Sequence, residues 1–223
     1  MPQVYLVKSF TSTPSVKHTA ESTVRRLSRY LRFLEEHRRR GYETISSGDL
    51  AALGGTTSAQ VRKDLSFFGS FGTRGLGYSV AALARRIREI LGLDREWNVI
   101  IVGAGKIGGA LAQYRGFRER GFNVVGVYDL DRERVGQSLD GVVIKDQKEL
   151  DADIAKLKPD IALLAVPADA AQSLVDRVAK AGVHGILNFA PTPLHAPAGV
   201  NLRSVDMALE LEILSYALAN ADT

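Results

Sequence analysis

Residues 97–111, WNVIIVGAGKIGGAL, are the most informative segment of the sequence. Its apolar, β-branched run from Val99 to Val102 is typical of a buried strand. Three glycines follow in the spacing G-x-G-x-x-G, and a helical pattern follows the glycines. A strand, a glycine turn and a helix in this order predict a dinucleotide-binding unit whose turn cradles a pyrophosphate. The predicted cradle consists of Gly103, Ala104, Gly105, Lys106, Ile107 and Gly108.

The rest of the chain after this turn predicts an α/β fold with a doubly wound parallel sheet of the Rossmann type, because short apolar strands alternate with helices. The helix after the glycines is expected to run to Arg120. The loops at Val166–Pro167 and at Phe189 follow two of the expected strands, so they fall on the carboxyl edge where such sheets bind ligands. Further strands are expected over residues 123–128, 142–144, 160–166, 183–187 and 200–205.

Asp129 stands where a dinucleotide-binding sheet places the carboxylate that binds the adenosine ribose. It lies 21 residues beyond Gly108, close to the spacing of about 20 that this role requires. A carboxylate there favours NAD(H) over NADP(H), since it repels a 2′-phosphate. The alternative is that Asp129 is only a turn residue at the end of its strand.

Composition separates the front of the chain from the rest. Residues 1–94 hold 15 of the 29 Lys and Arg and 8 of the 25 Asp and Glu, a net charge of +7, which leaves −3 for residues 95–223. A basic front favours a polyanion such as DNA as its partner, although chance scatter of surface charge is the alternative. The sequence has no cysteine, which excludes disulfides and thiolate metal sites. It also lacks a signal peptide and a membrane-length apolar run, so we expect a cytoplasmic protein without a metal.

Two capping boxes in the basic part predict a pair of short helices with helix-turn-helix spacing. Ser46-x-x-Asp49 begins the first helix, and Thr57-x-x-Gln60 begins the second, which runs through Phe68. The outer face of the second helix carries polar and cationic side chains suited to a major groove. The residues expected to contact DNA there are Thr57, Ser58, Gln60, Arg62 and Lys63. Gln60 has an alternative role, which is only to close its capping box.

The segments on either side of this pair complete the expected domain. A preceding helix, capped at Thr19, is expected to bury a stripe formed by Val24, Leu27, Leu31 and Leu34. Residues 69–78, GSFGTRGLGY, hold four glycines and predict a hairpin that follows as a wing. Arg74 at its tip is expected to enter a minor groove, and the alternative is an exposed loop arginine.

The C-terminal stretch DMALELEILSYALA, residues 206–219, predicts a helix that is apolar nearly all round. Such a helix needs cover on more than one side, and a partner subunit that exchanges this helix is the simplest cover. The expected domains are an arm over residues 1–18, a winged helix over 19–94, a Rossmann domain over 95–205 and a swapped dimerisation helix over 206–223.

Four segments, in order along the chain, resemble the Rex family of bacterial redox-sensing transcriptional repressors. They are QVRKDLSFFGSFGTRGLGY (60–78), VGAGKIGGAL (102–111), ILNFAP (186–191) and VDMALELEIL (205–214). The resemblance implies a homodimer that binds operator DNA when NADH is scarce and releases it when NADH binds, with NADH and NAD⁺ as its ligands. It also implies a redox-dependent polar network between Arg32, Tyr114 and Asp206 of the partner subunit. Taken alone, these three residues are a solvated helix position, a packing residue and a helix cap.

Two other functions compete with this one. An NAD-dependent dehydrogenase with an accessory basic domain needs a general acid or base, and the four histidines, His18, His37, His184 and His195, offer none in an evident constellation. A nucleotide-binding subunit of the CoA-ligase type, with a basic extension that contacts another protein, leaves the Q-V-R-K and G-T-R-G runs unexplained.

Overall fold

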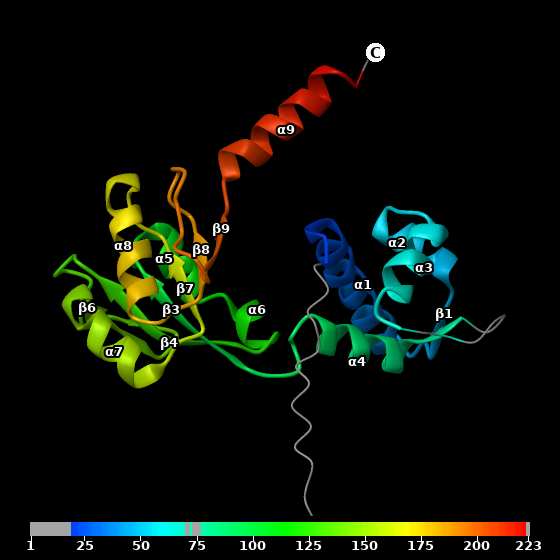
Figure 1. Cartoon of the computed structure of the whole chain (residues 1–223), viewed down its shortest axis with the longest axis horizontal. Helices are drawn as coiled ribbons and strands as arrows, with labels where there is room; N and C mark the ends of the chain where they lie inside the picture. Colours follow the sequence, from blue (N-terminus) through cyan, green and yellow to red (C-terminus); the bar gives the residue numbers. More distant parts are fainter. Residues whose placement is uncertain (1–18, 70–71, 73–76, 222–223) are drawn as a thin grey trace, which may run out of the picture. The chain divides into compact units, whose positions relative to one another are not determined.

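The computed structural model describes residues 19–69, 72 and 77–221. The chain divides into two compact units, and the division falls between Asp94 and Arg95. The first unit is mostly helical, and the second is a largely parallel sheet with helices on both faces (Figure 1). The arm predicted over residues 1–18 and the wing tip predicted at Arg74 lie outside the described residues.

The first unit packs its helices around one apolar core. Its described elements are α1 (Glu21–Arg39), β1 (Thr44–Ile45), α2 (Ser47–Gly54), α3 (Ser58–Ser66), β2 (Tyr78–Ser79) and α4 (Val80–Ile90). The predicted stripe of α1 is confirmed at three of its four positions, since Leu27, Leu31 and Leu34 are fully buried. Val24 is 38% exposed, and the fully buried Tyr30 completes the stripe instead.

The ends of the helices follow the predicted capping boxes in part. Ser46 and Asp49 form the complete box at the start of α2, and Gly55 ends α2 in the left-handed conformation. The predicted cap at Thr19 is wrong, because α1 begins one residue later and its first hydrogen bonds end on the carbonyl of Ala20. The strand β1, which was not predicted, pairs antiparallel with β2 at the end of the predicted hairpin. Two residues give no period by which a sequence reveals a strand.

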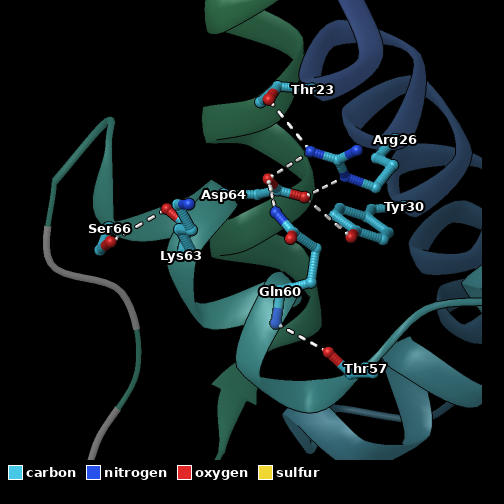
Figure 2. Close-up of polar contacts among 8 residues, drawn as sticks. All are labelled: Thr23, Arg26, Tyr30, Thr57, Gln60, Lys63, Asp64 and Ser66. Atoms are coloured by element: carbon cyan, nitrogen blue, oxygen red, sulfur yellow. Dashed lines mark hydrogen bonds and ion pairs between the residues drawn. The ribbon is translucent and has the colours of Figure 1, made fainter. Parts of the chain in front are cut away.

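A buried carboxylate joins α3 to α1. Asp64 is 3% exposed and accepts two hydrogen bonds from Arg26, through Nε at 2.6 Å and Nη2 at 2.8 Å (Figure 2). The Tyr30 hydroxyl donates a third at 3.0 Å, and Nε2 of Gln60 donates a fourth at 2.8 Å. Burial raises the pKa of Asp64, but the bonds from Arg26, Gln60 and Tyr30 outweigh it and hold the pKa below its ordinary value of 3.8. Asp64 therefore stays charged and fixes α3 against α1.

The second unit is built on a sheet in the order β5-β6-β4-β3-β7-β8-β9. All neighbouring strands are parallel except β5 and β6. The parallel strands run in the doubly wound order of a Rossmann fold, with a switch between β3 and β7, which confirms the predicted fold class. The strands are β3 (Trp97–Val102), β4 (Phe122–Asp129), β5 (Ser138–Leu139), β6 (Val142–Asp146), β7 (Ile161–Leu164), β8 (Gly185–Asn188) and β9 (Asn201–Ser204).

Helices cover both faces of this sheet. The short helix η1 (Gln147–Glu149) leads into α7 (Leu150–Leu157), which packs with α8 (Ala168–Lys180) over one apolar core (Figure 1). The other core takes Ala112 from α5 (Lys106–Ala112) and Phe117 from α6 (Arg115–Arg118).

The helix that follows the glycines is shorter than predicted. A single helix to Arg120 was expected, but the chain is extended at Tyr114, with φ −76° and ψ 101°, so α5 and α6 are separate. Tyr114 is 60% exposed, so it does not continue the buried face of α5. Its ring instead meets Phe117 edge-on, with ring centroids 5.1 Å apart.

The chain ends in the predicted apolar helix, α9 (Met207–Ala219), which runs away from the sheet after β9 (Figure 1). Asp206 caps α9, because its Oδ1 accepts hydrogen bonds from the backbone nitrogens of Ala208 and Leu209. Every residue from Asp206 to Ala221 is exposed. The exposed apolar side chains of α9 are Met207, Leu209, Leu211, Ile213, Leu214, Tyr216 and Leu218.

The Asp64 cluster makes a pH-dependent prediction about the first unit. We expect Asp64→Asn to lower the free energy of opening of α1 and α3 by about 2 kcal/mol at pH 7, because Arg26 loses its charged partner. Since the folded-state pKa of Asp64 is lowered, its stabilisation is complete above the unfolded-state pKa of about 3.9 and is lost as the pH falls through the folded-state pKa.

Amide hydrogen exchange of peptides from α1 and α3, at pH 7 and pH 3, measures this difference. Peptides from β3 in the other unit serve as the internal control. Equal protection of α1 and α3 in the two proteins at pH 7 contradicts the prediction.

Candidate nucleotide site and recognition helix

The glycine loop is packed so closely that two of its glycines admit no side chain. Gly103 has a φ of +94°, and a Cβ on it would lie 2.3 Å from the backbone oxygen of Ala165. A Cβ on Gly108 would lie 1.7 Å from the carbonyl oxygen of Gly103. The tight turn and the close approach of helix to strand expected from the motif are therefore present.

Gly105, by contrast, faces open space. The atom nearest to a Cβ on Gly105 is Nη1 of Arg134, at 4.0 Å. Gly105 has an ordinary φ of −66°, so its backbone does not require glycine. It is the N-cap of α5, whose first backbone N–H groups, from Lys106 onward, have no partner within the helix. An open cradle lined by backbone donors fits the pyrophosphate of a dinucleotide.

Asp129 lies at the end of β4 and is 8% exposed. Its Oδ2 accepts a hydrogen bond from the backbone nitrogen of Ala104 at 2.6 Å, and its Oδ1 accepts one from that of Asp131 at 2.8 Å. Burial raises the pKa of Asp129, but these bonds and the nearby Arg134 lower it overall. An ionised carboxylate thus lies beside the glycine loop and also holds that loop in place.

The two predicted carboxyl-edge loops lie close to the glycine loop. A Cβ on Gly103 would come within 3.0 Å of Cγ1 of Val166, and Pro167 follows as the exposed N-cap of α8. The backbone nitrogen of Phe189 donates to the carbonyl of Leu164, the last residue of β7, at 2.8 Å. The sheet therefore brings the three predicted segments, which are the glycine loop and the loops at Val166 and Phe189, to its carboxyl edge near the switch point.

A buried amide shapes the loop that carries Phe189. The side chain of Asn188 is fully buried. Its Oδ1 accepts a hydrogen bond from the backbone nitrogen of Ala190, and its Nδ2 donates to the carbonyl of Ala190 and to the hydroxyl of Ser204. Asn188 thus closes the turn at Phe189 and ties it to β9.

α3, the candidate recognition helix, presents polar and cationic side chains on its outer face. Thr57, Arg62 and Lys63 are exposed, and Ser58 and Gln60 are half-buried. The guanidinium of Arg62 donates to the hydroxyl of Ser47 at 3.0 Å, so it also braces α3 against α2. Gly55 separates the two helices with helix-turn-helix spacing.

The second capping box is only half formed, and this corrects one reading of Gln60. The hydroxyl of Thr57 accepts a hydrogen bond from the backbone nitrogen of Gln60 at 3.2 Å. The Gln60 side chain does not turn back to Thr57 but donates to Asp64 (Figure 2). The alternative that Gln60 only closes its capping box is wrong, because an ionised carboxylate attracts the amide more strongly.

The three residues of the expected polar network are all exposed. Arg32 lies on α1 in the first unit, whereas Tyr114 and Asp206 lie in the second. Both cap bonds at α9 end on Oδ1 of Asp206, which leaves its Oδ2 outside the cap.

Neither histidine of the second unit has a hydrogen bond to the glycine loop among the described contacts. His184 immediately precedes β8, at the amino edge of the sheet and thus opposite the loop. The backbone of His195 is bonded to the side chain of Gln172. Among the described residues, no group of three His, Asp or Glu side chains is placed to hold a metal ion. No helix in that part of the chain is long and apolar enough to cross a membrane.

Comparison with known proteins covers both units. Residues 18–66 match a family model described as "Putative DNA-binding protein N-terminus", and residues 94–192 match one described as "CoA binding domain". The redox-sensing transcriptional repressor Rex of Carboxydothermus hydrogenoformans is 49% identical over 196 residues, which are 88% of this chain and 94% of that protein. The chain belongs to the Rex family of redox-sensing transcriptional repressors.

The chain also matches other Rex proteins and solved structures over most of its length. Rex of Streptomyces coelicolor is 46% identical over 88% of this chain and 76% of its own length. Among solved structures, RSP in complex with β-NAD⁺ and operator DNA has a TM-score of 0.88 and 38% identity, and covers 92% of this chain and 95% of its own. RSP in complex with β-NADH has a TM-score of 0.85 and 37% identity, and covers 92% of this chain and 97% of its own.

Two side chains that contribute to these sites were not predicted from the sequence. The spacing i, i+4, i+7 predicts that Val61, Leu65 and Phe68 point inward from this helix. Asp64 lies on the same face, and a charge there signals a buried partner. Arg134 lies beside the glycine loop, with Nη1 3.4 Å from Oδ2 of Asp129. Only the fold brings Arg134 there, and no spacing rule reveals it.

The glycines of the loop provide a matched pair of variants. We expect Gly105→Ala to leave thermal unfolding unchanged but to weaken NADH binding by about tenfold or more, because the methyl group fills the cradle. Gly108→Ala should lower the free energy of unfolding by about 2 kcal/mol, because its methyl group meets the backbone of Gly103.

Circular dichroism melts and fluorescence titration with NADH measure the two effects. Wild-type NADH affinity in Gly105→Ala means that the cradle lies elsewhere. A wild-type melting temperature in Gly108→Ala contradicts the close packing of α5 on β3.

Proposed function

We propose that this chain is a cytoplasmic repressor that binds operator DNA as a homodimer and leaves it when NADH binds. The observation that carries the proposal is the match to RSP over 92% of this chain, in one structure with operator DNA and β-NAD⁺ and in another with β-NADH. A helix-turn-helix unit and a dinucleotide-binding fold in one chain suit a DNA-binding protein that responds to the NADH/NAD⁺ ratio.

The second unit supplies the nucleotide site in this proposal. The cradle at Gly105 takes the pyrophosphate, and the free lone pairs of the Asp129 carboxylate take ribose hydroxyls. The loops that carry Val166 and Phe189 line the nicotinamide end, because they follow the strands on the far side of the switch from β4. When bound, the nicotinamide supplies the redox signal, since its charge and shape differ between NAD⁺ and NADH.

The first unit supplies the DNA contacts. Lys63 and Arg62 offer cationic groups to phosphates or guanines, and Gln60 offers an amide to a base edge. Thr57 and Ser58 lie at the start of α3, where backbone N–H groups suit a phosphate. Arg74 would add a contact from the wing.

α9 supplies the contact between two copies. Its exposed apolar side chains need cover, and exchange of the helix with a second copy covers it symmetrically. The Oδ2 of Asp206 would then meet Arg32 and Tyr114 of the other copy in one arrangement of the dimer and not in the other. Such a pair, made in one state and broken in the other, is a latch.

No chemical conversion of the nucleotide is part of this proposal, because binding two arrangements unequally is sufficient. The dehydrogenase alternative needs an acid or base beside the cradle, and His184 lies at the opposite edge of the sheet. Turnover of NAD⁺ with small alcohols or hydroxy acids would favour that alternative.

A gel-shift experiment tests the proposal directly. The probe is a duplex that the full chain selects from a random-sequence library, at fixed salt. We expect NADH to release this duplex at concentrations at which NAD⁺ does not. Retention of the duplex at saturating NADH would falsify the sensor.

Two variants should separate the two sites. We expect Lys63→Ala to weaken binding of the selected duplex by about tenfold while NADH affinity stays unchanged. Asp129→Ala should leave duplex binding unchanged and raise the NADH concentration needed for release by about tenfold. Gel shifts and NADH titrations on both proteins measure this. Loss of both activities in either variant means misfolding, and normal release in Asp129→Ala makes Asp129 only a turn residue.

A further inference from the structure

The amide of Gln60 lies between a buried charge and the outer face of α3. We propose that Asp64 is a positioning residue for DNA reading: it fixes the Gln60 amide so that one acceptor and one donor face an adenine edge in the major groove. This inference rests on the proposed function and adds a specificity-determining pair to it.

The chemistry of the pair decides which way the amide points. An ionised carboxylate has only acceptors, so the nitrogen of the Gln60 amide must face it and the oxygen must face away. The distance from Nε2 of Gln60 to Oδ1 of Asp64 is 2.8 Å (Figure 2). One N–H of Gln60 is used in this bond, which leaves Oε1 and the second N–H. An acceptor beside a donor is the pattern that pairs with N6 and N7 of adenine.

The anchor itself accepts three hydrogen bonds from two residues of α1. Arg26 donates twice to Asp64, and Tyr30 donates once, all from α1. Asp64 is 3% exposed, whereas Gln60 is half-buried. The fixed charge therefore lies inside the unit, and the amide proposed to contact the base lies at its surface. Lys63, one residue before Asp64, is exposed.

A purely structural role for the cluster makes a different prediction. If Gln60 is only a fourth donor to a buried charge, its loss changes the stability of the unit and weakens DNA binding evenly. If Gln60 reads a base, its loss changes the preference at one position of the duplex and leaves the other positions unchanged.

The experiment compares the base preferences of four full-length proteins, selected from one random-sequence duplex library at fixed salt. We expect the wild type to prefer adenine at a position where Gln60→Ala loses about 10- to 100-fold of that preference. Asp64→Asn should relax the same position, because an amide at residue 64 lets the Gln60 amide turn over. Tyr30→Phe is the matched control, since it removes one bond to Asp64 but keeps the charge, and it should keep the wild-type preference.

A second measurement tests the anchor in the wild-type protein without any change to Asp64. The side-chain amide protons of Gln60, identified in a nitrogen-15 spectrum by their loss in Gln60→Ala, should exchange with water more slowly than those of exposed glutamines. Exchange at the rate of an exposed glutamine overturns the proposal.

The selection has two further outcomes that overturn the inference. One is wild-type base preference in Asp64→Asn, and the other is an even loss of binding, without a change of preference, in Gln60→Ala. If the wild type selects no sequence at all, the proposed function fails instead, so the two failures can be told apart.

Discussion

A buried polar group must be surrounded by hydrogen-bond partners, and this requirement shapes each functional element of the chain. The buried polar side chains among the described residues are Asp64, Asp129 and Asn188. Asp64 holds the recognition helix, Asp129 holds the glycine loop through Ala104, and Asn188 closes the turn at Phe189. In each case the cost of burying the group is offset only in one local geometry. In the proposed function, the same groups that make the elements rigid would also set how these elements meet DNA or a nucleotide.

Rigid elements suit a switch that works by binding alone. A nucleotide that prefers one arrangement of a dimer a hundredfold shifts the balance by about 2.7 kcal/mol. This preference of the nucleotide for one arrangement is lost if the helices and loops deform instead of moving as rigid bodies. α1 carries Arg26, which is bonded to the recognition helix, and Arg32, which is exposed on the same helix. A displacement of Arg32 would therefore be transmitted along α1 to Arg26 and, through the hydrogen bonds of Asp64, to α3.

The features that the sequence predicts well are those that a local pattern specifies. The apolar run of β3, the three glycines and the amphipathic helices each follow from residues within one or two turns of one another. The two-residue strand β1 depends on its pairing with β2, which is distant in the chain, so no local pattern reveals it. The break at Tyr114 leaves no mark in the local helical pattern. The partner of the Gln60 side chain is only four residues away, at Asp64, but the bonds that hold Asp64 come from α1. Asp64 is the instructive case. It was not predicted, although its position on an apolar stripe is a sign of burial, and only the packing of α1 on α3 identifies Arg26 and Tyr30 as its partners.

The apolar side chains of α9 raise the question of burial between two chains. Its large apolar side chains, from Met207 to Leu218, are 50–72% exposed in the single chain. Covering each of them is worth about 1–2 kcal/mol, so together they are comparable with the net stability of a typical domain. In the proposed dimer a second copy covers this helix, and Asp206, its N-cap, enters that contact. Asp206 and the exposed apolar surface of α9 are thus adjacent, so the proposed dimer contact and the proposed latch would form one structural unit.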